Sequence, residues 1–274
     1  MPSFPHRMTA SGVLLGLAIS GVAAAHPWES GAHLWLDYTP DFEYRERGVM
    51  TQDGALAGVG GALVHSWPES QLRFRLAGDL RAGTTDYDGQ TQDGRPTESE
   101  ADDAVLRAEA LLGWSLFEDA PAGNLLAFGG LGVRNWGQDL KDGRTEDGDR
   151  AGGYGRGHRY VYLPVGGHWS NDLSDRVGVH ATASYQVLLR GRATADLSDI
   201  DPRLSDLSLP MNDGAGYRLA GGLSYALRVI TLTSEIYYQR WDIEESDSRR
   251  SGGFEWIEPE NSTDELGLRV GVYW

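Results

Sequence analysis

The segment DELGLRVGVYW, residues 264–274, decides the fold of this chain. Its residues alternate in kind with a period of two, which is the period of a β-strand. One face carries Leu266, Leu268, Val270, Val272 and Trp274, and the other carries Glu265, Gly267, Arg269, Gly271 and Tyr273. The strand therefore has one apolar face, which has to be covered either by a protein core or by lipid.

The N-terminal residues indicate that the protein is exported. His6 and Arg7 precede a short apolar run at residues 12–22, and Ala23 to Ala25 follow it. This order predicts a secretory signal peptide that is cleaved after Ala25. The alternatives are a buried helix or a membrane anchor, but about ten apolar residues are too few to span a bilayer. We therefore predict a signal peptide at 1–25 and one mature domain at 26–274.

Composition removes several classes of protein. The chain has 24 basic and 40 acidic residues, a net charge of −16, and no cysteine. Such an acidic chain is an unlikely partner for nucleic acid, and the absence of cysteine excludes disulfides and thiolate metal sites. No later segment offers the ~18 apolar residues of a transmembrane helix. These facts leave an exported β-protein, either a soluble sandwich or a membrane barrel.

Alternation recurs along the whole mature chain. Clear alternating segments lie at 34–44, 71–82, 104–114, 176–190, 216–225, 229–239 and 264–274. Glycine or proline blurs the pattern in three weaker candidates, at 55–66, 124–136 and 158–169. Together these segments predict about ten strands, an even number of the length that membrane barrels use.

The connections between these strands also alternate. Tight joins are expected near 67–70, 118–124, 170–175 and 226–228. Long polar segments are expected at 83–103, 137–157, 191–213 and 243–262, with a shorter one at 48–54. This arrangement is typical of an all-β, antiparallel up-and-down transmembrane β-barrel with short periplasmic turns and long, solvated extracellular loops.

Aromatic residues favour the barrel over the sandwich. One closes every second predicted strand, at Trp67, Trp114, Trp169, Tyr225 and Trp274. Aromatic rings at such positions anchor a barrel at the membrane–water interface, with the ring in lipid and its polar atom in water. A second girdle at the opposite interface is expected from Phe42, Tyr44, Tyr217 and Tyr238. A soluble sandwich has no reason to place an aromatic residue at every second strand end.

With these features the chain resembles the Gram-negative outer-membrane β-barrel proteins as a superfamily, although no particular family is indicated. The resemblance implies an outer-membrane location in contact with lipid and lipopolysaccharide. It also implies that the barrel-assembly machinery recognises the last strand. The residues that match this assembly signal are Leu266, Leu268, Val270, Val272 and Trp274.

The polar faces of the predicted strands line the lumen. The cations there are Arg73, Arg75, Arg81, Arg107, Arg218 and Arg269. The predicted inward acids are Asp37, Asp41, Glu43, Asp79, Glu109, Glu235 and Glu265. The interleaved signs favour a charge-paired plug, whereas a selective pore uses a ring of one sign. A porin-like small-solute channel or a small-ligand site is the alternative.

Two kinds of barrel enzyme were weighed against this interpretation. Asp86 and Asp88 resemble the Asp-x-Asp pair of omptin proteases, but the segment at 191–213 lacks the histidine that this family requires. A lipid A-modifying enzyme needs a Ser–His pair, and His180 and Ser184 lie about 13 Å apart by strand rise. We therefore predict a non-enzymatic protein with no catalytic residue.

Metal and cofactor motifs are weak. The acidic runs at 145–150 and 198–206 lack the full spacing of a calcium loop. The sequence therefore predicts no cofactor and no metal site, and it leaves the ligand of the extracellular loops open.

Overall fold

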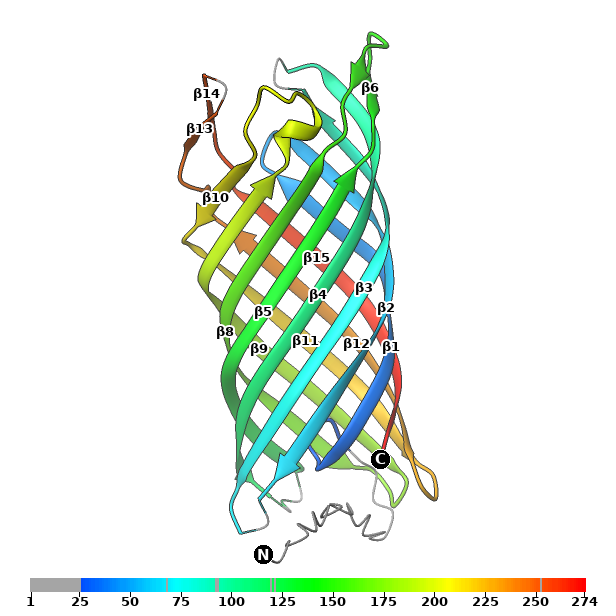
Figure 1. Ribbon diagram of the computed structural model, residues 1–274. Helices are drawn as coiled ribbons and strands as arrows, with labels where there is room; N and C mark the ends of the chain where they lie inside the picture. The colour runs from blue at the N-terminus through cyan, green and yellow to red at the C-terminus, as the bar shows by residue number, and fades with distance from the viewer. Residues whose placement is uncertain (1–25, 68, 92–93, 119, 121, 252) are drawn as a thin grey trace, which may run out of the picture.

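The computed structural model describes residues 26–67, 69–91, 94–118, 120, 122–251 and 253–274. The predicted signal peptide lies outside these residues. Ten long strands form a closed antiparallel barrel (Figure 1). They are β1 (Gly31–Glu46), β2 (Met50–Ser66), β3 (Leu72–Gln90), β4 (Pro96–Phe117), β5 (Asn124–Leu140), β8 (Gly155–Asp172), β9 (Val177–Ala195), β11 (Gly214–Ala226), β12 (Thr231–Ile243) and β15 (Asn261–Tyr273).

Each strand pairs with its neighbour in the chain, and β1 closes the ring against β15. We call the end with the four short connections, between β2 and β3, β4 and β5, β8 and β9, and β11 and β12, the turn end. The other end is the loop end. The chain terminates at the turn end, at the bottom of Figure 1. The predicted fold class and strand number are confirmed.

Period-two alternation sorts the side chains as the sequence predicts. Leu266, Leu268 and Val270 of β15 are exposed on the outer wall, whereas Glu265 and Arg269 are buried inside. Leucine, isoleucine and valine side chains dominate the exposed outer wall of the neighbouring strands too. An exposed apolar wall around a closed barrel is typical of barrels that contact lipid.

The register of β1 differs from the prediction at one point. Between Tyr38 and Asp41 the strand contains one residue more than β15 opposite it, which is a β-bulge at Pro40. The extra residue reverses the alternation beyond it. Phe42 and Tyr44 therefore point inward and are fully buried, and the predicted places for them in an outer aromatic girdle are wrong.

Glycine makes room for large inward rings. The Tyr237 ring of β12 lies directly over Gly267 of β15, where an added Cβ would come within 2.3 Å of Tyr237 Cζ. The Tyr162 ring of β8 covers Gly132 of β5 in the same way. These glycines are therefore packing positions, because any side chain there would displace a buried aromatic ring.

The polar segments at the loop end are more regular than expected. Much of the predicted loop at 83–103 is paired strand, since β3 and β4 stay in register through Gln90 and Pro96. The other segments carry short elements: β6 (Gly143–Thr145), β7 (Arg150–Ala151), η1 (Leu197–Asp199), β10 (Leu207–Met211), β13 (Arg249–Ser251) and β14 (Phe254–Trp256). Ladder pairing satisfies backbone groups even where both faces of a strand are wet. In the described residues, no helix is long and apolar enough to cross a membrane.

Candidate functional site

The candidate site is the lumen, which side chains fill in three layers. At the turn end, residues 26–30, which precede β1, place Trp28 inside the barrel. Trp28 is buried against Leu111, Leu126 and Phe128. Arg73 holds this segment by donating a hydrogen bond to the Trp28 carbonyl oxygen (3.0 Å). The segment therefore works as an internal stopper that covers the apolar wall of this layer.

The middle layer is a network of buried ion pairs. Glu265 accepts hydrogen bonds from Arg81 (2.7 Å) and Arg134 (3.0 Å). Asp79 accepts two from Arg107, at 3.0 and 2.8 Å. Neither carboxylate side chain has measurable exposure to solvent. Buried charges are tolerated only when they are paired and hydrogen-bonded, and this network meets that condition.

A second part of this layer joins the first through Arg269. Arg269 donates to Asp37 (2.7 Å) and to Asp79 (3.3 Å). The Tyr237 hydroxyl also donates to Asp37, at 2.7 Å. Arg218 pairs with Glu235 at 3.2 Å and stacks on the Tyr237 ring. Cations and acids thus alternate across the lumen, which is the arrangement of a packed core rather than of a selective ring.

All nine residues predicted for the lumen charge network point inward, but they do not form a single network. Arg73 lies nearer the turn end and pairs with Glu118. Glu109 accepts a hydrogen bond from the Tyr162 hydroxyl (2.8 Å). Asp41 and Glu43, which were also expected inside, face outward because of the bulge at Pro40. Within these nine residues, Arg107 and Asp79 form the shortest ion pair, at 2.8 Å.

The loop-end layer holds a polar cluster that the sequence did not reveal. Glu258, which follows β14, accepts hydrogen bonds from the Tyr44 hydroxyl (2.9 Å) and from Arg156 (3.1 Å) and shares one with His158 (2.7 Å). Arg156 also pairs with Glu46. Burial by itself raises the pKa of Glu258, but the positive charge of Arg156 and the hydrogen bonds outweigh it and lower the pKa to about 2.

This pKa predicts how barrel stability depends on pH. A lowered pKa in the folded state gives stability that is present above the unfolded pKa of 4.5 and is lost as the pH falls toward about 2. The shift corresponds to about 3 kcal/mol. We expect the free energy of unfolding to fall between pH 5 and pH 2 in the native chain and to fall less steeply in Glu258→Gln. Urea titrations across this pH range measure both slopes. Equal slopes would contradict the prediction.

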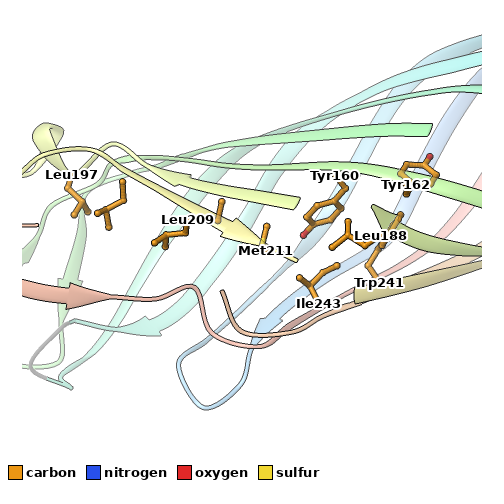
Figure 2. Close-up of a cluster of buried hydrophobic side chains, with 10 residues drawn as sticks. Tyr160, Tyr162, Leu188, Leu197, Leu209, Met211, Trp241 and Ile243 are labelled. Carbon is orange, nitrogen blue, oxygen red and sulfur yellow. The ribbon is translucent and has the colours of Figure 1, made fainter. Parts of the chain in front are cut away.

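An apolar cap covers the rest of the loop-end layer. The segment between β9 and β11 buries Leu197, Leu209 and Met211 in one apolar cluster with Tyr160 and Trp241, in which Met211 lies nearest to these rings and Leu197 farthest from them (Figure 2). The β10 strand attaches this segment to β9. The predicted loop at 191–213 is therefore partly an extension of the barrel wall with buried apolar side chains, and not wholly a solvated loop. A second buried apolar cluster, which includes Leu56 and Trp136, lies beside it.

The residues that the sequence offered as catalytic candidates are not arranged for catalysis. Asp86 and Asp88 lie exposed on the outer wall of β3, away from the lumen. His180 faces Glu235, with Nε2 3.5 Å from its carboxylate, and not Ser184, so the two do not form a catalytic pair. Among the described residues, no cluster of three or more His, Asp or Glu side chains is placed to hold a metal ion.

Sequence reasoning missed Arg134, Arg156, His158 and Glu258. Arg134 stands in β5 and the next two in β8, where glycine and proline obscure the alternation. Glu258 lies outside every strand, so its inward position depends on how the last loop folds. Alternation in β5 with Leu131 and Val133 on the outer face would have identified Arg134 as inward.

The five aromatic residues predicted at the membrane interface share one location. Trp67, Trp114, Trp169, Tyr225 and Trp274 are all exposed on the outer wall at or beside the turn end. Trp169 donates a hydrogen bond from its indole nitrogen to the Ala122 carbonyl oxygen (2.8 Å). Their role as membrane anchors stays a prediction.

Comparisons with known proteins support the fold and nothing narrower. No protein-family model and no curated protein matches the chain. Among solved structures, it is similar to the outer membrane protease OmpT from Escherichia coli, with a TM-score of 0.57 and 12% identity over 89% of this chain and 97% of that one. The translocator domain of the autotransporter NalP from Neisseria meningitidis gives a TM-score of 0.45 and 16% identity over 90% and 88%. The likeness to the OmpT structure shows that the chain has the fold of an outer-membrane β-barrel, as its sequence predicts, and no particular family is identified.

Proposed function

We propose that the chain is an integral outer-membrane barrel without enzymatic activity, whose lumen is a structural core and whose activity lies in its acidic extracellular loops. The observation that carries this proposal is the buried network around Glu265 and Asp79. An open channel needs a continuous wet path, and the stopper at 26–30, the ion pairs and the apolar cap each occupy part of it. The residues that the sequence offered for hydrolysis do not support it, since Asp86 and Asp88 lie on the outer wall and His180 faces Glu235 rather than Ser184.

Planar-bilayer recording tests this proposal against the channel alternative. We expect purified protein in a lipid bilayer to give no stable conductance steps, because the buried ion pairs leave no room for hydrated ions. Deleting residues 26–30 should not open the barrel, since the middle and loop-end layers stay filled. Regular ohmic steps from the intact protein would contradict the filled lumen and favour the channel.

The outer wall also suggests how the barrel meets its lipid. Arg159 of β8 and Arg190 and Arg192 of β9 are exposed on the outer wall, and Arg159 is the cross-strand partner of Arg192. Arg159 donates to the side chain of Asn135, and in the described part of the chain none of the three forms an ion pair. In so acidic a protein, three adjacent arginines without acidic partners need another source of negative charge. We propose that this arginine patch binds the phosphate groups of lipopolysaccharide.

The height of the patch fits this role. Arg159 and Trp169 lie ten residues apart on the same strand. At about 3.3 Å per residue and a tilt of about 40°, the two are roughly 25 Å apart along the barrel axis. That distance equals the apolar band of an outer-membrane barrel. With Trp169 at the inner interface, the arginine patch would reach the headgroups of the outer leaflet.

Removing the charges of the arginine patch tests whether the patch binds lipopolysaccharide. Each arginine near a lipid surface contributes about 1 kcal/mol, so the triple change of Arg159, Arg190 and Arg192 to Gln should weaken lipopolysaccharide binding about 100-fold. The matched control changes Arg45, Arg47 and Arg240, which already pair with acids, and should have little effect. The measurement is the amount of lipopolysaccharide that each purified triple variant retains, relative to the native protein. Equal retention by the two triple variants would contradict the proposal.

The last strand carries the proposed assembly signal. Trp274 ends the chain on the outer wall, and its backbone pairs with Ala32 of β1. Deleting Trp274 should reduce insertion into the outer membrane several-fold without reducing export, because the barrel-assembly machinery is expected to read the terminal aromatic residue. The measurements are the yield in outer-membrane fractions and the heat-modifiable migration of the folded barrel. An unchanged yield would argue against this signal.

A further inference from the structure

A cavity of about 290 Å³ lies at the turn end, beside the stopper segment. His26, His168, Ser115 and Ser170 line it, and all four are buried. The ion-pair network of the lumen does not use these residues. Arg73 also borders the cavity, but its guanidinium is engaged by the Trp28 carbonyl oxygen and by Glu118.

The two histidines of this cavity each have one nitrogen held and one nitrogen free. Nε2 of His26 lies 3.0 Å from a carboxylate oxygen of Asp172, and Nδ1 has no partner. Nδ1 of His168 lies 2.8 Å from the hydroxyl of Thr182, and Nε2 has no partner. His26 and His168 are 4% and 2% exposed, and both free nitrogens are buried. Buried polar atoms without a partner are uncommon and costly.

This arrangement is the one that metal-binding histidines use. In such sites an oxygen atom fixes the outer nitrogen of the ring, which orients the ring and leaves the other nitrogen as the ligand. An ionised carboxylate only accepts hydrogen bonds, so Asp172 places the proton of His26 on Nε2 and a lone pair on Nδ1. Two imidazoles alone make a weak site, and the described residues offer no third side chain placed to complete it.

The third ligand follows from processing of the chain. Cleavage after Ala25, as the sequence predicts, makes His26 the first residue and gives it a free α-amine. The α-amine and Nδ1 of one histidine close a chelate ring around a metal ion. We propose that the processed chain binds one Cu²⁺ ion through the α-amine and Nδ1 of His26 and Nε2 of His168. The inference rests on signal cleavage and is independent of the proposed function of the loops.

The donor set selects the metal. Nitrogen ligands without sulfur suit Cu²⁺, which forms the most stable complexes of the divalent first-row metals. Zn²⁺ accepts the same ligands with lower affinity. The amine has to lose its proton on binding, so the apparent affinity should rise with pH. The negative charge of Asp172, which lies beside His26, offsets part of the charge of the ion.

Copper titration of the full processed chain tests the proposal. Protein purified from outer membranes, with His26 verified as its first residue, should bind one equivalent of CuCl₂. Electron paramagnetic resonance should show coupling to nitrogen ligands. His168→Ala should weaken binding at least 100-fold. His65→Ala is the matched control, since His65 is exposed on the outer wall near the same end, and it should change nothing.

A second variant tests the contribution of the His26 α-amine separately from that of the two imidazoles. Inserting Gln-Ser between Ala25 and His26 leaves both imidazoles in place but moves the α-amine away, and it should weaken binding by a similar factor. Heat-modifiable migration checks that each variant is folded. The proposal is overturned if the inserted chain binds Cu²⁺ as tightly as the native chain. It is also overturned if the first residue is not His26, if no equivalent of copper binds, or if binding disappears in His65→Ala.

Discussion

Replacing Glu265 by glutamine is expected to destabilise the barrel by about 3–5 kcal/mol. The change keeps the shape of the side chain but removes its charge, which leaves Arg81 and Arg134 without a shared carboxylate in the middle of the lumen. Arg81 retains hydrogen bonds to Thr39 (3.0 Å) and Tyr237 (3.1 Å) and a contact with Asp79 (3.4 Å). Among the described residues, Arg134 is left with the rings of Trp136 and Tyr160. Urea unfolding of the barrel in lipid vesicles measures the loss.

Two companion variants separate burial from charge. Glu260 pairs with Arg47 on the exposed surface, so Glu260→Gln should cost less than about 1 kcal/mol. Adding Arg134→Met to Glu265→Gln removes one of the stranded cations and should recover part of the loss, because a buried pair replaced by apolar groups is often neutral. A loss below about 1 kcal/mol in Glu265→Gln would mean that water reaches the network, and it would weaken the case for a filled lumen.

Placing arginine at Leu268 is expected to cost about 2–4 kcal/mol if the outer wall faces lipid. Leu268 is exposed between its cross-strand partners Tyr38 and Ile236, which are exposed as well. It lies about six residues above Trp274, or roughly 15 Å along the axis, near the middle of the apolar band. A charge there would lose its hydration. Urea unfolding in lipid vesicles measures the cost.

The matched control uses the same strand and the same face. Ser262 also points outward from β15 but lies at the loop end, opposite Arg45 and Asp242. Ser262→Arg should therefore cost less than about 1 kcal/mol, since the depth dependence falls away near the interface. Equal costs at the two positions would contradict the membrane depth that we assign to Leu268.

Spin labels on single cysteines read the same face directly, because the native chain has no cysteine. In membranes, accessibility to oxygen should be high at positions 266, 268, 270 and 272 and low at 267, 269 and 271. Uniformly low values would mean that protein covers this face, as in a soluble sandwich.

The sequence by itself determined the two faces of the wall. Alternation is a local property, since every side chain of a strand points opposite to its neighbour. Leu266 and Arg269 could therefore be placed outside and inside from the letters alone. The aromatic residues that end alternate strands and the short polar joins between strands are local signals too, so they fixed the number of strands and the order in which they pair.

A single local irregularity was enough to break this reasoning. The bulge at Pro40 reverses the direction of every later residue in β1, so Asp41 and Glu43 exchange places with Phe42 and Tyr44. Proline inside a strand signals such a point, since it donates no ladder hydrogen bond. The sequence pattern does not show which way the chain shifts its register there.

Tertiary structure decided what fills the lumen and which charges meet. Arg81 and Glu265 lie 184 residues apart in the chain, and their contact exists only because the ring closes. The stopper at 26–30, the cap around Met211 and the inward fold of Glu258 come from segments outside the ten barrel strands, where alternation gives no guidance. The physical reason is that alternation chooses a face, whereas closure of the barrel chooses the partners of the side chains on that face.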